Sequence, residues 1–391
     1  MSIQTARRMN HARRSFVREI LKAAANPGII SFAGGLPNPR FIPVDEISGL
    51  CRQILAEQGA AALQYCTAEG HPPLRQWVAD QYAASGLNVL ADQIIITSGS
   101  QQGFDLLGKV LVEPDDKVIV EDPTYIAAIQ AFGMYEPNLS AVPMDENGID
   151  LDLLKAALIG GARILYTMPN FQNPTGISYS ADRRHQVAAL LRNESTVLVE
   201  DDPYHLLGFD GNVLPPIANH LPERTVLFGS FSKILAPGLR LGWICAPTEL
   251  IEKLTIAKQA VDLCSENLGQ WVIHSLITSE SFPRHLQTIR TAYGSQCRAM
   301  REAVLRYMPE VECTQPTGGM FLWVTLPTGV SAMELFQIAI AKGVAFVPGQ
   351  AFFAHGGGEN TLRLNFTRCE ADCVDDGIRR LGEALEQTLV S

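Results

Sequence analysis

The stretch Phe228–Pro247, FGSFSKILAPGLRLGWICAP, places a lysine where the surrounding chain is apolar. Lys233 follows the strand-like run Val226–Phe228 and precedes the apolar run Ile234–Ala236. An ammonium group that loses its hydration must either reach water or use its amine chemically. A surface lysine on a connection between two strands is the ordinary interpretation of such a residue, so the rest of the chain has to decide.

Composition predicts a globular protein with a large core. The chain has 391 residues, of which 47% are hydrophobic and 18% charged, and its mean hydropathy is +0.07. This length predicts two domains, or one large and one small. The net charge of −10 argues against binding to nucleic acid or to an anionic membrane. No run approaches the ~20 apolar residues of a spanning helix.

The cysteines and the N-terminus bear on the compartment. Eight cysteines lack a CxxC spacing or a zinc-like pairing with histidine, which is typical of a reducing compartment, so we expect a cytoplasmic protein without a metal site. The N-terminus is rich in arginine, as in a transit peptide, but lacks the apolar region of a secretory signal. A structural arm is favoured, because residues 15–21 lead into a helical pattern.

Apolar runs alternate with helical patterns between about residue 45 and residue 250. Such alternation, with nearly continuous apolar strands, predicts an α/β fold with a mostly parallel sheet covered by helices on both faces. The expected strands lie within residues 93–97, 116–123, 163–169, 195–203 and 225–232.

The C-terminal part follows a different pattern. It is mainly helical, with two expected strands at 318–326 and 361–367, a helix between them and one after, which predicts a smaller α+β domain. We therefore expect an N-terminal arm and helix that join the small domain (1–44), a large domain (45–275) and a small domain (276–391).

Polar residues stand at the ends of the expected strands, where ligands bind in open α/β sheets. Ser100 and Gln101 open a helix after a glycine turn, which suits a phosphate, although such a start is more often a plain cap. Tyr125 could stack on a flat ligand or pack in the core. Asn173 lies in an Asn-Pro-Thr-Gly turn, and Asp201 ends an apolar strand, where a carboxylate needs a partner.

Together with Tyr204, Ser230, Ser232, Lys233 and Arg240, these residues match the needs of pyridoxal phosphate. A lysine forms a Schiff base with the cofactor aldehyde, and neighbouring cations lower the pKa of its amine. A carboxylate keeps the pyridine nitrogen protonated, which makes the ring an electron sink.

The chain resembles the fold-type I pyridoxal-phosphate enzymes of the class I and II aminotransferase group over nearly its full length. The signature S-x-S-K-x3-[PS]-G-x-R-x-G is met by SFSKILAPGLRLG, and the order SGSQQG, DPTY, NPTG, EDDPY, SFSK, TGGMF, LRLNF matches throughout. Within the group the chain is most similar to the 2-aminoadipate and kynurenine aminotransferase-like subgroup, through SFAGGLPNP, LQYCTAEGHPPLR and EDDPYHLL.

The resemblance implies roles for the residues around the cofactor ring. Lys233 matches the Schiff-base lysine, which also moves a proton during the reaction. Asp201 matches the partner of the pyridine nitrogen. Asn173 and Tyr204 match the residues that hydrogen-bond the phenolic oxygen, and Tyr125 matches the residue that stacks on the ring.

The resemblance also implies a phosphate site and a dimer. The matching phosphate ligands are Ser100, Gln101, Ser230, Ser232 and Arg240. Tyr65 matches a residue that reaches the phosphate from the partner subunit, so we expect a homodimer with shared active sites.

Substrate binding follows from the same resemblance. Arg363 matches the arginine that binds the substrate α-carboxylate through two hydrogen bonds. Gly34 and Gly35 match a loop that passes beside the substrate. Ser15 and Arg18 match a mobile helix whose arginine binds a distal carboxylate, although Arg18 could merely solvate a helix face.

The implied activity is transfer of an amino group from an L-α-amino acid to a 2-oxo acid, with 2-oxoglutarate as the expected acceptor. Expected donors are 2-aminoadipate, glutamate, aromatic or branched-chain amino acids. Arg40 departs from the similar enzymes and could offer a second cation to the substrate or face solvent. A lyase, decarboxylase or racemase shares the same cofactor residues. A pyridoxal-phosphate-binding regulatory domain is disfavoured, because only about thirty residues precede the matching region.

Overall fold

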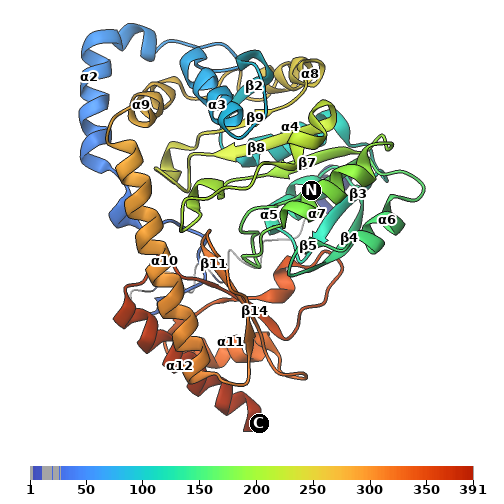
Figure 1. The fold of residues 1–391 in the computed structure, drawn as a ribbon, viewed down its shortest axis with the longest axis vertical. Helices are drawn as coiled ribbons and strands as arrows, with labels where there is room; N and C mark the ends of the chain where they lie inside the picture. Colours follow the sequence, from blue (N-terminus) through green and yellow to red (C-terminus); the bar gives the residue numbers. More distant parts are fainter. Residues whose placement is uncertain (1–2, 11–19, 21–25, 27, 391) are drawn as a thin grey trace.

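The computed structural model describes residues 3–10, 20, 26 and 28–390. An eight-stranded sheet organises one part of the molecule and a four-stranded sheet the other (Figure 1). The strands of the large sheet, in spatial order, are β2 (Ile94–Thr97), β9 (Gly242–Cys245), β8 (Thr225–Ser230), β7 (Val197–Asp201), β6 (Ile164–Thr167), β3 (Lys117–Asp122), β4 (Asn138–Asp145) and β5 (Gly148–Ile149).

The centre of this sheet is parallel. Neighbouring strands from β8 to β4 run in the same direction, whereas β9 is antiparallel to both β8 and β2, and β5 is antiparallel to β4. All five strands expected here are confirmed, as β2, β3, β6, β7 and β8. The sequence did not predict β4, which is mostly half-buried and contains polar residues and Pro143, so it lacks a continuous apolar run.

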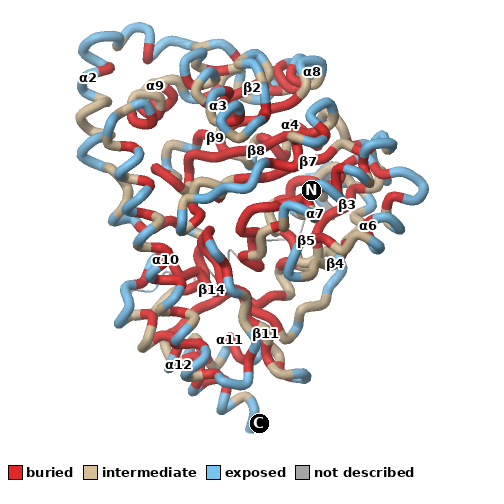
Figure 2. Tube along the Cα trace, in the orientation of Figure 1, coloured by how far each residue is buried: buried red, intermediate tan, exposed pale blue. Residues whose placement is uncertain are grey.

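Hydrophobic clusters on the two faces of the sheet explain why its central strands are apolar throughout. Ile119 and Leu198 pack in one cluster with α6 (Leu151–Leu158) and α7 (Ala181–Leu191). Val120 and Val199 pack in the other cluster with α4 (Ser100–Leu111) and α5 (Ile126–Gly133). Successive strand residues point to opposite faces, so a sheet covered on both faces needs apolar side chains at every position. Buried residues accordingly follow the strands along the sheet (Figure 2).

Helices of the large part flank this sheet and continue beyond its β2 edge (Figure 1). They are α2 (Val44–Ala62), α3 (Pro72–Ala84), α4 (Ser100–Leu111), α5 (Ile126–Gly133), α6 (Leu151–Leu158), α7 (Ala181–Leu191), α8 (Thr248–Gln259) and α9 (Asn267–Ile277).

The smaller part is an antiparallel sheet with three helices. Its strand order is β10 (Glu312–Cys313), β11 (Phe321–Thr325), β14 (Thr361–Asn365), β13 (Val347–Pro348). The helices are α10 (Phe282–Tyr307), α11 (Ala332–Ala341) and α12 (Ala371–Val390), and α10 and α12 lie side by side (Figure 1). The two expected C-terminal strands are confirmed as β11 and β14, with α11 between them and α12 after.

The N-terminal segment contacts the smaller part. β1 (Ile30–Ser31) pairs in parallel with β12 (Val344–Ala345), with Ile30 opposite Val344. This pairing is compatible with an arm that joins the small domain, and the boundaries at 44 and 275 stay a prediction.

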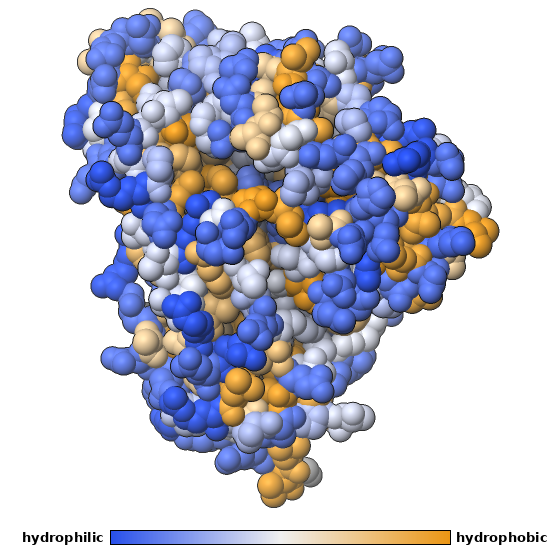
Figure 3. All heavy atoms as spheres, in the orientation of Figure 1, coloured by the Kyte–Doolittle hydropathy of each residue, from blue (hydrophilic) through white to orange (hydrophobic). Residues whose placement is uncertain are grey.

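The surface shows no large apolar face in the view of Figure 3, where hydrophilic residues predominate and apolar ones form small separate groups. Among the helices that the structure describes, none combines the length and the apolar character needed to cross a membrane.

Candidate active site

The candidate site lies at the carboxyl-terminal edge of the large sheet, where parallel strands end side by side. β7 ends at Asp201, and its neighbour β8 ends at Ser230, shortly before Lys233. Asn173 follows β6, and Tyr125 follows β3. Since these strands point the same way, the loops after them meet at one edge.

Lys233 reaches across this edge toward the N-terminal loop. Its Nζ atom donates a hydrogen bond to the carbonyl oxygen of Gly35 at 3.0 Å. Burial lowers the pKa of this amine to about 8; the positive charges of Arg363 and Arg240 lower it too, whereas Asp201 opposes them. A substantial fraction of the amine is therefore neutral near physiological pH, and a neutral amine is a nucleophile and a proton acceptor.

Asp201 presents an acceptor to the same space. Its side chain is buried, and Oδ2 accepts a hydrogen bond from the hydroxyl of Tyr166 at 2.8 Å. Oδ1 has no hydrogen-bond partner within the described part of the chain. Burial raises the pKa of Asp201 to about 7, although the Tyr166 hydrogen bond and the Lys233 charge act in the opposite direction. A buried carboxylate with an unmatched oxygen favours a protonated or cationic partner.

Asn173, Tyr204 and Tyr125 form the polar wall beside Asp201. The Asn173 side chain hydrogen-bonds Tyr204, and burial raises the pKa of Tyr204 well above its ordinary value. Burial also raises the pKa of Tyr125 to about 12. Both phenols therefore stay protonated and act as hydrogen-bond donors. Tyr125 lies at the N-terminal end of α5, with its ring centre 6.2 Å from that of Phe104.

Arg363 stands in the middle of β14 and faces the large part of the molecule. Its guanidinium lies 4.1 Å from the ring centre of Phe321 and 4.9 Å from that of Phe352. Nη1 donates to Oδ1 of Asn173 at 2.6 Å, and Nη2 donates to the Ala33 carbonyl at 2.8 Å. Nε has no partner among the residues described. Burial lowers the pKa of Arg363 to about 10, so an anion that pairs with this cation would stabilise its charged form.

A cationic site for an anion lies at the start of α4. Gly99 precedes Ser100 with a φ of 74°, and a Cβ atom added there would come within 2.7 Å of the Arg240 guanidinium. The first turn of a helix leaves backbone N–H groups without helical partners and carries a positive dipole. Ser230 and Ser232 stand near each other, because the Ser232 N–H donates to Oγ of Ser230 at 3.1 Å.

Close packing fixes the N-terminal loop beside this site. Gly34 is buried, and a Cβ atom added to Gly35 would approach the Phe321 ring at 3.1 Å. The carbonyls of Ala33 and Gly35 already accept from Arg363 and Lys233, so the loop connects these two cations.

Other predicted residues lie away from this group or outside the described residues. Tyr65 is 78% exposed, and Gln101 is exposed on the first turn of α4. Ser15 and Arg18 fall outside the described residues. Arg40 is exposed and forms an ion pair with Glu370, so it faces solvent rather than Arg363.

Sequence reasoning missed the side chains that hold the predicted ones in place. Tyr166 lies inside an apolar strand, and a buried hydroxyl needs a partner, which was a usable signal for its bond to Asp201. Phe321 and Phe352 contact the Arg363 guanidinium, but the sequence gave no signal of this. Aromatic residues in such segments are usually interpreted as part of the hydrophobic core.

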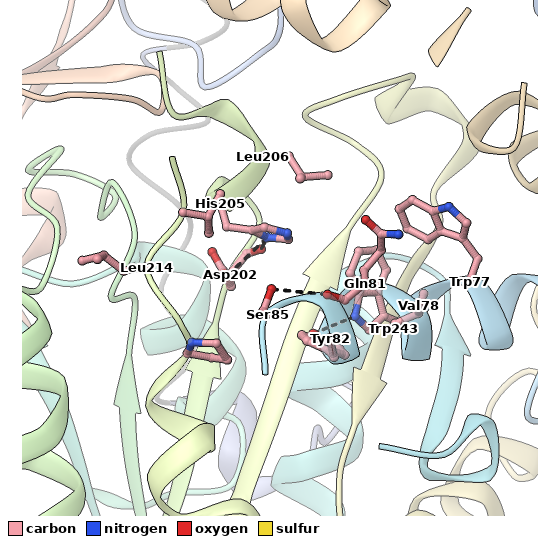
Figure 4. A pocket seen from close by; sticks show the side chains of 12 residues that line it. Trp77, Val78, Gln81, Tyr82, Ser85, Asp202, His205, Leu206, Leu214 and Trp243 are labelled. Atoms are coloured by element: carbon pink, nitrogen blue, oxygen red, sulfur yellow. Dashed lines mark hydrogen bonds and ion pairs between the residues drawn. The ribbon is translucent and has the colours of Figure 1, made fainter. Parts of the chain in front are cut away.

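A separate small cavity lies behind β7 (Figure 4). Asp202 faces it, paired with His205 through Oδ2 and Nδ1 at 3.3 Å, opposite Trp77 and Trp243. Asp201 and Asp202 are consecutive, so their side chains point to opposite sides. The cavity of about 20 Å³ has room for about one water molecule, which excludes it as a cofactor site.

The residues at the sheet edge fit pyridoxal phosphate. The unmatched oxygen of Asp201 suits a protonated ring nitrogen, and the Asn173 and Tyr204 side chains suit an anionic ring oxygen. The start of α4 with Arg240 suits the phosphate. Lys233 supplies an amine with a lowered pKa. Arg363 adds a separate cation for a substrate carboxylate.

Comparison with known proteins agrees with this geometry. The family model described as aminotransferase class I and II matches residues 39–381. Aromatic-amino-acid aminotransferase 1 of Thermococcus litoralis is 41% identical over 96% of this chain and 92% of its own. The 2-aminoadipate transaminase of Thermus thermophilus is 42% identical over 96% of this chain and 94% of its own.

A solved structure shares the fold. The alpha-aminoadipate aminotransferase LysN of Thermus thermophilus, complexed with N-(5'-phosphopyridoxyl)-L-leucine, superposes with a TM-score of 0.92 at 40% identity, covering 99% of this chain and 98% of that one. The chain therefore belongs to the class I and II aminotransferase family and is a pyridoxal-phosphate-dependent aminotransferase of fold type I.

Proposed function

We propose that the enzyme moves an amino group from 2-aminoadipate, glutamate, or an aromatic or branched-chain L-amino acid to 2-oxoglutarate. The observation that carries this proposal is the position of Arg363, a buried cation held between two aromatic rings with Nε unpartnered among the described residues. A planar guanidinium binds a carboxylate through two hydrogen bonds, and amino acids and 2-oxo acids share that carboxylate. The names of the similar enzymes support aromatic amino acids and 2-aminoadipate among these donors.

The residues around the cofactor have distinct roles in this proposal. Bound pyridoxal phosphate supplies an electron sink for negative charge that develops at the substrate α-carbon. Asp201 keeps a proton on the ring nitrogen. Asn173 and Tyr204 hydrogen-bond the ring oxygen, and Tyr125 stacks on the ring.

Lys233 has the central role. Its amine would hold the cofactor aldehyde and, when free, would accept the proton that leaves the substrate α-carbon and return it to the substrate–cofactor pair. General acid–base transfer by a positioned group contributes about 10²–10⁴-fold to a rate. The lowered pKa of Lys233 supports this role, because it increases the fraction of neutral amine near neutral pH, and only the neutral amine can accept a proton.

The phosphate site and the subunit partner complete the proposal. Ser100, Gln101, Ser230, Ser232 and Arg240 hold the phosphate. Tyr65 reaches the phosphate of the cofactor that is bound to a second copy of the chain, so the enzyme acts as a homodimer. The high exposure of Tyr65 supports this assignment, since a tyrosine that is 78% exposed in one chain is free to contact another.

Specificity for an acidic side chain is assigned to the N-terminal segment. Arg18 binds the distal carboxylate of glutamate or 2-aminoadipate, with Ser15 on the same segment, and Gly34 and Gly35 leave room for the substrate. This assignment rests on the resemblance of residues 15–21, which lie outside the described part of the chain.

The test is the absorbance spectrum of the holoenzyme, recorded alone and with L-glutamate or L-2-aminoadipate added separately. We expect the visible band of the bound aldehyde to give way to the near-ultraviolet band of the aminated cofactor, and the faster donor identifies the preferred class. A visible band that neither acid removes would contradict these donors. Release of ammonia together with a 2-oxo acid would indicate a lyase, and release of carbon dioxide with an amine would indicate a decarboxylase.

A further inference from the structure

A buried carboxylate stands beneath the loop that carries Asn173. Glu121, on β3, is completely buried. It accepts hydrogen bonds from the Met168 N–H at 3.0 Å, from Nε2 of Gln172 at 2.9 Å and from the Tyr179 hydroxyl at 2.8 Å. All three partners are neutral donors, so the carboxylate acts here as a hydrogen-bond acceptor for the loop.

Gln172 transmits this contact to the turn. Its Nε2 atom also donates to the Pro123 carbonyl at 2.8 Å. On the other side of the amide, Oε1 accepts from both the backbone N–H and the hydroxyl of Thr175, at 2.9 and 2.7 Å. The backbone N–H of Gly176 closes the turn on the Gln172 carbonyl at 2.6 Å. The amide therefore has its donors on the side of Glu121 and its acceptor on the side of Thr175.

The orientation of this amide matters because the turn from Gln172 to Gly176 contains Asn173. If the amide rotated by half a turn, its NH₂ group would face the N–H of Thr175, and buried donors would be left without acceptors. An ionised carboxylate accepts hydrogen bonds and cannot donate them. In its ionised form Glu121 thus favours the orientation of Gln172 that closes the turn, and the Pro123 carbonyl favours the same orientation.

We propose that Glu121 is a positioning residue for substrate binding, because through Gln172 it holds Asn173 against Arg363. The inference rests on the proposed roles of Asn173 and Arg363. The hydrogen bonds of the Glu121 and Gln172 side chains given by the described residues do not reach Arg363, and the coupling runs through the turn to the Asn173–Arg363 hydrogen bond. Burial raises the pKa of Glu121 to about 7, and its three donors oppose that rise, so the loop itself stabilises the charged form.

Three variants test the inference. Glu121→Gln replaces one acceptor oxygen with a donor of the same size, which conflicts with the NH₂ of Gln172. The double variant Glu121→Gln/Gln172→Glu exchanges the two groups, so that a donor at 121 again faces an acceptor at 172, which can still accept from Thr175. The matched control is Glu200→Gln on β7. Glu200 is equally buried, and burial also raises its pKa to about 7, but it accepts from the N–H groups of Ile217 and Ala218, at 3.0 and 3.1 Å. It also lies 3.9 Å from Nη1 of Arg184, whose guanidinium donates to Pro169 and Asn170 and not to the turn from Gln172 to Gly176.

The first readout is hydrogen exchange at the Thr175 amide in the apoprotein, which needs no activity. We expect Glu121→Gln to speed this exchange by about tenfold or more, the scale of one lost buried hydrogen bond. The double variant should recover part of the protection, only part because the Pro123 carbonyl loses its donor. Glu200→Gln should leave the Thr175 exchange unchanged while it speeds exchange at 217–218.

The second readout is steady-state kinetics. We expect Glu121→Gln to raise the KM for the amino donor by about tenfold with a smaller effect on kcat, and the double variant to lower it again. Equal losses in Glu121→Gln and Glu200→Gln, or no recovery in the double variant, would overturn the inference. If the exchange results hold but the wild type has no aminotransferase activity with the proposed donors, the donor assignment has failed rather than the link from Glu121 to the turn.

Discussion

Nη1 of Arg363 donates to Oδ1 of Asn173 at 2.6 Å, and this hydrogen bond joins strand β14 of the small sheet to the loop after β6 of the large one. The Ala33 carbonyl and the rings of Phe321 and Phe352 restrain the same guanidinium. Its plane is therefore set before a carboxylate binds, which reduces the entropy that binding must overcome.

The first prediction concerns this arginine. Arg363→Lys keeps a positive charge but removes the planar fork and the contacts with the rings. We expect the KM for both the amino donor and the 2-oxo acid to rise by about 10–10²-fold, the scale of a charged hydrogen bond, with a smaller change in kcat. Steady-state kinetics with each substrate varied provides the measurement. Arg40→Lys, at an exposed cation paired with Glu370, is the control and should change neither value.

The second prediction concerns the stability of the apoprotein. The pKa of Lys233 is about 8 in the folded chain against 10.5 in an unfolded one. Between these values the unfolded chain binds more protons, so the free energy of unfolding rises with pH in that window. Below about pH 8 the buried ammonium lowers stability by a constant amount.

Lys233→Met removes that ammonium. We expect the variant apoprotein to be more stable than the wild type by about 1–3 kcal/mol at pH 7, and the difference to shrink between pH 8 and pH 10.5. Urea unfolding at several pH values measures both trends. Lys253→Met, at an exposed position on α8, should show neither. A variant that is less stable than the wild type at pH 7 contradicts the pKa assigned to Lys233.

The sequence predicted those features of the fold and of the site that depend on the residue pattern within a single segment of the chain. Lys233, Asp201 and Asn173 each follow a strand that could be predicted, because a sheet buried on both faces requires continuous apolar runs. Once the strands are parallel, their carboxyl ends must meet, so the meeting of these three residues could also be predicted. Strand β4 was missed because a partly exposed strand next to the edge of the sheet does not need such a run.

Contacts between distant segments could not be predicted in the same way. The stacking of Arg363 between Phe321 and Phe352, and the orientation of Gln172 by Glu121, depend on packing between elements that are far apart in sequence. Arg40 shows that closeness in sequence is not enough. This cation follows the predicted substrate loop, but it pairs with Glu370 at the surface.

The third prediction concerns the subunit that supplies Tyr65. If Tyr65 reaches the partner's site, as proposed, Tyr65→Ala and Lys233→Ala would each inactivate both sites of a homodimer. A hybrid of the two variants contains one site with Lys233 from one subunit and Tyr65 from the other, and that site is intact. The two variant proteins are mixed and allowed to exchange subunits. At limiting cofactor, we expect the activity of the mixture to exceed the sum of the activities of the two variants measured separately. Activity equal to the sum would place Tyr65 outside the partner's site.

The fourth prediction concerns acidic substrates. We expect Arg18→Ala to raise the KM for L-glutamate and 2-oxoglutarate by about tenfold, because a charged hydrogen bond to the distal carboxylate is lost. The KM for L-leucine should stay the same, since its side chain carries no charge. Arg40→Ala serves as the control for loss of a surface cation. An unchanged KM for glutamate and 2-oxoglutarate in Arg18→Ala shows that this arginine does not select the substrate.

The central claim is that Lys233 holds the cofactor, and the most direct measurement locates the covalent bond. Reduction of the holoenzyme with borohydride makes the link between cofactor and amine permanent, and peptide mass mapping then identifies the modified lysine. We predict the pyridoxyl group on the peptide that contains Lys233, and no labelling of that peptide when the holoenzyme is saturated with the amino donor before reduction. A pyridoxyl group on a different lysine, with Lys233 unmodified, would contradict the account.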